Sequence, residues 1–402
     1  MNSPDSALRA ITDQVREAAA SGAPLRICGG GSKAFYGAAS SGEVAGELLD
    51  TRAWAGITSY EPSELVVTAR AGTPLAELEA ALADKGQCLP FEPPHFQIGA
   101  AAAGRIATVG GMVSAGLSGP ARASVGGVRD YILGVQILNG RAELLSFGGT
   151  VMKNVAGYDV SRLMAGAMGT LGLITEVSLK VLPVAPAEAS LVFELDQAQA
   201  LTQLHRWGAQ PLPLNASRWE PIPVEADEAA ASANGQLWVR LRGAVAAVQA
   251  ACARMLKDAP GQYIDNAVAA PIWQACRDHR LAFFTQPPTP GWALWRLSVA
   301  QTAPALNLPW PQLIEWHGGL RWCWAPLEGA AAIRTAARQA GGNASVFIAN
   351  YVYPTRENTL FHYQEALRPP LDTIHRRLKA EFDPAGIFNR NRLFPETTPV
   401  PS

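Results

Sequence analysis

The sequence predicts an α+β protein made of three parts. A chain of 402 residues is too long for one ordinary core, and its hydrophobic content of 48% is that of packed domains rather than a disordered chain. Glycine loops alternate with strands from Ala107 to Pro183, and from about Val184 strand-like runs alternate with helical ones. We therefore expect one domain over 1–183, a second over 184–340 with an antiparallel sheet covered by helices, and a C-terminal segment over 341–402.

The charge balance excludes nucleic acid as a partner. With 33 Lys and Arg residues against 34 Asp and Glu, the formal net charge is -1, which provides no basic surface. No apolar run approaches the roughly 20 residues of a membrane-spanning helix, and the N-terminus lacks the features of a signal peptide. We expect a cytoplasmic protein that meets a membrane only peripherally, through partners.

The cysteines and histidines predict no metal site in this chain. Its five cysteines are odd in number and widely scattered, which is typical of free thiols, and they form no Cys-x-x-Cys motif. The six histidines stand apart, without a His-x-His or His-x-x-His pair. We therefore expect that this chain does not itself ligate an iron–sulfur cluster or a structural zinc ion.

A first candidate anion-binding loop follows an N-terminal helix. Apolar residues at helical spacing predict that helix over about 5–20, and a short strand over 25–28 leads into the loop Gly29–Lys33. The loop matches the relaxed dinucleotide fingerprint, but no helical periodicity follows it. A mononucleotide P-loop requires Gly-Lys-Ser/Thr, whereas the order here is Gly-Ser-Lys. A Rossmann loop, a phosphate loop of another kind and an ordinary glycine turn all remain open.

A second helix is expected between Thr73 and Gly86. Thr73 is a typical N-cap, Pro74 suits the first helical position, and leucines at 75, 78 and 82 share one face. Gly86 is suited to the end of this helix.

Residues 107–127 predict an open loop rather than a helix. Glycines at 110, 111, 116, 119, 126 and 127 are too dense for a helix or a central strand, because each adds backbone freedom that folding must remove. Such loops allow backbone N–H groups to come close to a ligand.

The loop leads into a predicted hairpin and a second glycine loop. A strand ends at Asn139-Gly140, the strongest short-range hairpin signal, and the return strand runs to Phe147. A short helix capped by Asp159 precedes the second loop, Gly166–Gly172. Alternating apolar residues then predict a half-buried strand over 174–182.

The stretch Trp316–Trp322 contains the candidate catalytic residues of the second domain. His317 can act as a base on a hydroxyl group, and Arg321 can hold a carboxylate through two parallel hydrogen bonds. The alternative is that both are structural residues. The many tryptophans of this domain can likewise line a ligand cavity or simply form core.

Four motifs in order resemble the FAD-binding domain of the vanillyl-alcohol oxidase and p-cresol methylhydroxylase (VAO/PCMH) superfamily, in particular its glycolate oxidase and D-lactate dehydrogenase branch. They are Thr-Val-Gly-Gly at 108–111, Gly-Gly-Val-Arg-Asp at 126–130, Lys-Asn-Val-Ala-Gly-Tyr-Asp at 153–159 and Gly-Thr-Leu-Gly-Leu-Ile-Thr-Glu at 169–176. The resemblance implies a PCMH-type domain of two α/β subdomains, a cap domain, and a C-terminal segment that returns to the FAD domain.

The same resemblance implies the cofactor and its contacts. FAD is expected to be noncovalent, because the first loop, a common attachment site, offers Phe35 and Tyr36, while His95 is expected at the surface or behind the flavin contacts. The pyrophosphate is expected on the N–H groups of Gly29–Lys33. The expected cofactor-binding residues are Gly29, Gly30, Gly31, Ser32, Lys33, Thr108, Gly110, Gly111, Ser118, Gly119, Ser124, Gly126, Asp130, Gly172 and Ile174.

One departure from the branch points to a subunit of a complex. Catalytic D-2-hydroxyacid dehydrogenases of the branch have a metal-binding His-x-His type site in the cap, which this chain lacks. The chain resembles the shorter FAD-binding subunits of bacterial glycolate oxidase complexes. That resemblance implies a larger catalytic FAD subunit, an iron–sulfur subunit that passes electrons towards membrane quinone, and a small 2-hydroxy acid as substrate. The alternatives are a stand-alone 2-hydroxy acid dehydrogenase using His317 and Arg321, and a non-catalytic flavoprotein scaffold.

Overall fold

The computed structural model describes residues 4–37, 46–98, 104–149, 159–222, 235–349, 367 and 369–393, and they form two units. Unit 1 comprises Met1–Leu117, Gly127–Pro183 and Pro354–Ser402, and unit 2 comprises Ser118–Gly126 and Val184–Tyr353. The chain remains in unit 2 beyond the boundary expected at 340. The reason is that β17 (Asn343–Ile348) pairs with β14 (Ala293–Ser298), in the sheet of that unit. The motif residues 153–158 lie outside the described ranges.

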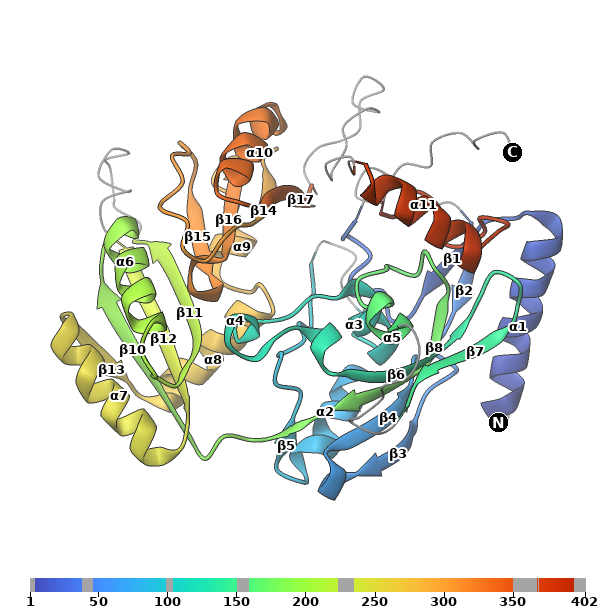
Figure 1. Cartoon of the computed structure of the whole chain (residues 1–402), viewed down its shortest axis with the longest axis horizontal. Coiled ribbons are helices and arrows are strands. Elements are labelled where there is room, and N and C mark those ends of the chain that lie inside the picture. The colour runs from blue at the N-terminus through green and yellow to red at the C-terminus, as the bar shows by residue number, and fades with distance from the viewer. Residues whose placement is uncertain are drawn as a thin grey trace. The chain divides into compact units, whose positions relative to one another are not determined.

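Unit 1 is built on a five-stranded antiparallel sheet of order β3-β4-β8-β6-β7. Its core includes Val67, Val135 and Val177, against which helix α3 (Val109–Ala115) places Met112 and Val113. Figure 1 shows α3 and the short helix α5 (Val160–Leu163) beside this sheet. The strands are β3 (Ile57–Glu61), β4 (Val66–Arg70), β6 (Ile132–Leu138), β7 (Leu144–Gly148) and β8 (Leu173–Lys180).

A second core in unit 1 surrounds the parallel pair β1 (Leu25–Cys28) and β2 (Glu47–Asp50). Ile11 and Val15 of α1 (Pro4–Ser21) pack there with Leu25 and Leu49, as the helical spacing of the sequence predicts. Phe388, from the C-terminal segment, is fully buried in the same cluster. The two clusters correspond to the two subdomains expected of the FAD domain.

The prediction of an open loop over 107–127 was wrong for its first part. Residues Val109–Ala115 form helix α3, with Thr108 accepting a hydrogen bond from Gly111 N and Gly116 ending the helix at φ 65°. A Cβ atom on Gly110 would lie 2.6 Å from Cβ of Ala71. Close packing of this helix against Ala71 therefore requires glycine at position 110. The packing offsets the low helix propensity of glycine.

The other local signals had mixed outcomes. The side chain of Asp159 caps α5 (Val160–Leu163), and β6 and β7 form the predicted hairpin, whose turn Asn139 closes by bonding Glu143. Thr73 does not cap α2 (Leu75–Ala83), whose N-cap is Pro74. The Thr73 hydroxyl instead donates to the carbonyl oxygen of Arg70 (2.7 Å) and accepts from Gly56 N (2.9 Å), so a tertiary contact replaced the cap.

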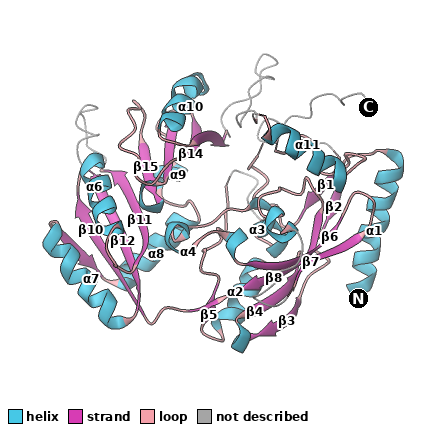
Figure 2. Ribbon diagram, viewed as in Figure 1, coloured by secondary structure: helices cyan, strands magenta, loops and turns pink. Residues whose placement is uncertain are grey.

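Unit 2 contains the predicted antiparallel sheet, here eight-stranded, with the order β13-β10-β12-β11-β15-β16-β14-β17. Helices pack on both faces of this sheet at β10, because alternate residues of that strand contact different helices. Figure 2 shows α6 and α7 beside β10 and β12. Leu191 and Phe193 of β10 pack with α6 and α7, whereas Val192 between them packs with α8. These elements are β10 (Ala187–Glu194), α6 (Gln197–Gly208), β11 (Leu214–Pro221), β12 (Gly235–Gly243), α7 (Val245–Asp258), β13 (Gly261–Ile264), α8 (Asn266–Arg277), α9 (Ala282–Thr285), β15 (Gln312–Glu315), β16 (Leu320–Ala325) and α10 (Ala330–Gln339).

The short segment Ser118–Gly126 is part of unit 2 although unit 1 flanks it on both sides in sequence. It contains α4 (Arg122–Val125). The Trp316 indole N–H donates to the carbonyl oxygen of Gly119 (3.0 Å), and the Arg122 guanidinium lies over the indole, 4.5 Å from the ring centroid. These contacts attach the segment to unit 2.

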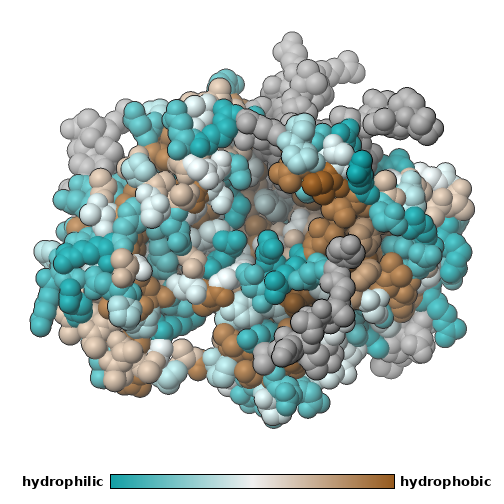
Figure 3. All heavy atoms as spheres, viewed as in Figure 1, coloured by the Kyte–Doolittle hydropathy of each residue, from teal (hydrophilic) through white to brown (hydrophobic). Residues whose placement is uncertain are grey.

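A buried carboxylate organises the C-terminal segment of unit 1. The Asp383 side chain is fully buried, accepts from the N–H groups of Ile387 (3.0 Å) and Phe388 (2.8 Å), and pairs with Lys379 Nζ (2.6 Å). Lys379 lies on α11 (Leu371–Phe382), over which Figure 3 shows apolar surface, since Leu371 and Ile374 are exposed. The Asp383 network fixes the course of the chain after α11.

We expect Asp383→Ala to lower the free energy of unfolding by about 3 kcal/mol, because it leaves two buried N–H groups without their acceptor and removes the carboxylate that pairs with Lys379. The Lys379 ammonium then keeps only the carbonyl oxygens of Thr170 and Phe388. The measurement is the shift of the urea unfolding midpoint. Asp13→Ala, which removes an exposed ion pair with Arg16, serves as control and should leave the midpoint nearly unchanged. Equal midpoints for the two variants would contradict the role of Asp383.

Candidate flavin site

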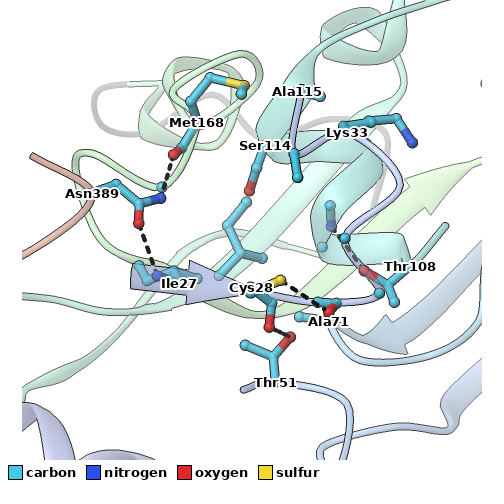
Figure 4. A pocket seen from close by; sticks show the side chains of 18 of the residues that line it. Ile27, Cys28, Lys33, Thr51, Ala71, Thr108, Ser114, Ala115, Met168 and Asn389 are labelled. Carbon is cyan, nitrogen blue, oxygen red and sulfur yellow. Dashed lines mark hydrogen bonds between the residues drawn. The ribbon is translucent and has the colours of Figure 1, made fainter. Parts of the chain in front are cut away.

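A pocket of about 120 Å³ in unit 1 collects several distant segments of the chain. Figure 4 shows it between the end of β1, the start of α3, the loop around Met168 and Asn389 of the C-terminal segment. Ten of the predicted cofactor residues line it: Gly29, Gly30, Gly31, Ser32, Lys33, Thr108, Gly110, Gly111, Gly172 and Ile174. The structure therefore brings together residues of the first loop, α3 and the second glycine loop.

The first glycine loop lies directly against residues 106–108. A Cβ atom on Gly30 would lie 2.1 Å from the carbonyl oxygen of Ile106, and one on Gly29 would lie 2.4 Å from Thr108 Oγ1. Ile106 N donates to the carbonyl oxygen of Gly30 (3.1 Å), which fixes this approach. Only glycine allows two segments to come so close.

The N–H groups of this loop are available to a ligand. Within the described ranges, no protein acceptor receives the N–H groups of Gly29, Gly30 or Gly31. At α3, by contrast, Gly110 N donates to Ala71 O (2.8 Å) and Gly111 N to Thr108 Oγ1 (3.3 Å). The N–H groups of Gly29–Gly31 are thus available to an anion, whereas those of Gly110 and Gly111 in α3 are used within the protein.

The pocket is positively charged. Arg26, Lys33 and Arg392 line it, and none of the described lining residues is an aspartate or glutamate. Lys33 is 8% exposed. Burial lowers the pKa of Arg392 to about 10, and the charge of Arg26 acts in the same direction. Free N–H groups and cations around one cavity are suited to phosphate.

Two residues of the C-terminal segment belong to the pocket, and sequence reasoning missed both. Asn389 Oδ1 accepts from Ile27 N (2.8 Å) and its Nδ2 donates to Met168 O (2.7 Å), so it joins β1 to the second glycine loop (Figure 4). Arg392 donates to the carbonyl oxygen of Lys33 (3.0 Å). The family resemblance predicted that the C-terminal segment returns to the FAD domain, but it predicted no particular contact.

The remaining predicted cofactor residues are not among the described residues that line this pocket. Ser118, Gly119, Ser124 and Gly126 belong to unit 2. Asp130 belongs to unit 1, where its carboxylate accepts from Gly127 N (2.8 Å) and stabilises the turn. Their roles as flavin contacts remain predictions.

His317 is held by hydrogen bonds on both ring nitrogens. Nδ1 lies 3.0 Å from Ser217 Oγ, and Nε2 lies 2.9 Å from Ser124 Oγ. Burial lowers its pKa to about 4, so the ring is neutral at pH 7. Its backbone has φ 55°, a conformation that costs energy for a residue with a side chain. These contacts favour the structural alternative over the predicted base.

Arg321 does not support the predicted carboxylate clamp. It is fully buried, its Nε donates to Gly318 O (2.8 Å), and its Nη2 donates to Ala303 O (3.1 Å). Burial lowers its pKa to about 10. The arginine binds main-chain carbonyl groups, and a substrate cannot reach it from solvent in this arrangement.

His95 and Phe35, which the sequence analysis considered in connection with covalent attachment of the flavin, both contact other protein side chains. His95 Nε2 lies 2.8 Å from Glu79 Oε2, and the ring of Phe35 packs against that of Phe96 at 5.5 Å between centroids. Among the described residues, no group of three or more His, Cys, Asp or Glu side chains is arranged to hold a metal, and no described helix could cross a membrane.

Comparison with known proteins decides the family. A family model described as FAD binding domain matches residues 8–148. The glycolate oxidase subunit GlcE of Escherichia coli (strain K12) is 42% identical over 388 residues, which cover 96% of this chain and 97% of that protein. This chain belongs to the GlcE family of VAO/PCMH flavoproteins. Its cofactor is FAD, and the described pocket fits the phosphate groups of that cofactor.

More distant relatives agree with this assignment of the GlcE-family chain. The glycolate oxidase subunit GlcD of Bacillus subtilis (strain 168) is 28% identical over 147 residues, which cover 37% of this chain and 30% of that protein. A solved structure of alkyldihydroxyacetonephosphate synthase superposes with a TM-score of 0.61 at 15% identity, over 94% of this chain and 74% of that one. The superposition confirms the predicted fold class.

We expect Gly30→Ala to weaken FAD binding by about tenfold or more, because the new methyl group forces the loop away from Ile106 and displaces its N–H groups. The measurement is FAD titration of the apoprotein by flavin fluorescence. Gly208→Ala is the matched control, since a Cβ atom there meets nothing within 4 Å. Wild-type affinity in Gly30→Ala would show that the loop does not bind the cofactor.

We expect His317 to titrate near pH 4, because burial favours its neutral form. A histidine in the unfolded chain has a pKa of about 6.5 and binds a proton first, so this group makes folding less stable as pH falls from about 6.5 to about 4. His317→Gln should reduce the acid sensitivity of the thermal midpoint, and His205→Gln is the control. NMR titration of His317 near pH 6.5 would contradict the assignment.

Proposed function

We propose that this chain is the FAD-binding subunit of a complex that oxidises glycolate, with D-lactate as a second candidate substrate, to the corresponding 2-oxo acid. The supporting observation is its 42% identity, over nearly the full length of both chains, to the Escherichia coli glycolate oxidase subunit GlcE. The phosphate-binding pocket adds physical support, because it provides what a flavin dinucleotide needs to be held without a covalent bond.

The described residues act by binding and orienting. One cavity is surrounded by the N–H groups of Gly29–Gly31 and the charges of Arg26 and Lys33. Because folding already places these donors, binding a ligand requires little further rearrangement of the protein. Asn389 holds the second glycine loop at its distance from β1. FAD, when bound, supplies a two-electron acceptor for the hydride of a 2-hydroxy acid.

A complex explains this chain better than a stand-alone enzyme does. Arg321 is buried on carbonyl groups and His317 is bonded on both nitrogens, so the base and clamp of the stand-alone alternative lose their support. We therefore propose a larger catalytic FAD subunit and an iron–sulfur subunit as partners. The oxidation releases two electrons, which the iron–sulfur subunit passes to quinone, and the assembly meets the cytoplasmic face of the inner membrane through these partners.

We expect the flavin of the isolated chain to remain oxidised when glycolate is added without oxygen, and to be reduced once the partner subunits are present. The measurement is the visible flavin spectrum, and acid precipitation should release FAD if it is noncovalent. Reduction in the isolated chain at ordinary enzyme rates would favour the stand-alone enzyme. A flavin that stays oxidised during turnover of the whole complex would favour the scaffold alternative.

A further inference from the structure

The C-terminal segment of unit 1 is attached directly to the strand that leads into the glycine loop. Leu25 N donates to Ile387 O (2.7 Å), and Asn389 N donates to Leu25 O (3.0 Å). Leu25 also forms a parallel bridge with Phe388, so the segment extends the pair β1-β2 on the other edge of β1. The segment is therefore in a defined register with β1 when it reaches the pocket.

This register places Arg392 against the glycine loop, at the pocket. Its Nη2 donates to Lys33 O (3.0 Å), and its backbone N donates to Asn389 O (3.1 Å). Gly37 makes room for it, since a Cβ atom there would lie 2.8 Å from Arg392 O and 3.3 Å from its Nε. The guanidinium is thus held in place by the loop and does not extend freely into water.

The charge of Arg392 has no protein counterion in the described part of the chain. No described carboxylate lies within salt-bridge distance of its guanidinium, and a second cation, Arg26, lines the same pocket. Burying like charges together is costly unless an anion joins them. A group with two adjacent negative charges, such as a pyrophosphate, would balance much of this charge and could use the free N–H groups of Gly29–Gly31 as well.

We propose that Asn389 and Arg392 form one wall of the dinucleotide site and that Arg392 is a further cation for the phosphate groups of FAD. The inference rests on the FAD cofactor of this chain, and it is independent of the substrate of the complex. It follows by linkage that cofactor binding and docking of the C-terminal segment stabilise each other. Asn389, bonded to Ile27 and Met168, is the positioning residue of this wall.

The test compares two arginines of the same segment. Arg392→Ala removes the cation that lines the pocket, whereas Arg390→Ala removes an equal charge whose guanidinium bonds Gly386 O and Gly22 O and does not line it. Apoproteins are titrated with FAD, ADP and riboflavin by calorimetry or fluorescence. We expect Arg392→Ala to weaken FAD and ADP by roughly ten- to hundredfold. Arg390→Ala should bind both as the wild type does.

Two further measurements distinguish a direct contact between Arg392 and phosphate from a general loss of structure: the salt dependence of ADP binding and the affinity for riboflavin. Added salt should weaken ADP binding more in the wild type than in Arg392→Ala, and riboflavin, which has no phosphate, should bind both proteins alike. Unchanged ADP affinity in Arg392→Ala, or an equal loss in Arg390→Ala, overturns the proposal.

A second measurement on the wild-type apoprotein needs no variant. Hydrogen exchange of the amides from Phe388 to Arg392 should slow when ADP is added, because ligand and segment stabilise each other. Unchanged exchange at saturating ADP overturns the linkage. A negative result in either test would not contradict the proposed oxidation of a hydroxy acid, because that proposal is tested separately by reduction of the flavin with glycolate.

Discussion

The candidate flavin site depends on the close approach of two backbone segments, Gly29–Gly31 and Ile106–Thr108. Side chains on the loop at Gly29 or Gly30 would overlap Thr108 and the carbonyl group of Ile106. Glycine there removes the obstacle, and the bond from Ile106 N to Gly30 O aligns the segments while the loop keeps its own N–H groups for a ligand. A phosphate site made of main-chain amides is accurate only when the backbone is held in this way.

The site also depends on pairing between the two ends of the chain. β1 carries the loop, and it lies between β2 and the segment around Phe388, which Asp383 and Lys379 hold in position. Asn389 continues this chain of contacts to Met168 in the second glycine loop. Four parts of the sequence must therefore be in place before the pocket exists, which makes cofactor binding a sensitive report on the folding of unit 1.

The residues that looked most catalytic in the sequence have structural roles in unit 2. Trp316 and His317 hold the segment Ser118–Gly126 through Gly119 and Ser124. Arg321 bonds the carbonyl groups of the adjoining turn and loop. Burial keeps Arg321 away from a substrate, and hydrogen bonds occupy both ring nitrogens of His317, which agrees with the proposal that this chain acts within a complex.

The sequence by itself determined the family, the cofactor, the antiparallel sheet of unit 2 and local features such as the β6–β7 hairpin and the Asp159 cap. These rest on near neighbours in the chain or on long motifs, which are readable without tertiary structure. Only the tertiary structure decided that the glycines at 110 and 111 lie in a helix, that Thr73 bonds a distant turn and that Arg321 is buried. It alone placed Asn389 and Arg392 in the pocket proposed to bind the flavin. Those outcomes depend on packing and pairing between residues far apart in sequence, which no local pattern records.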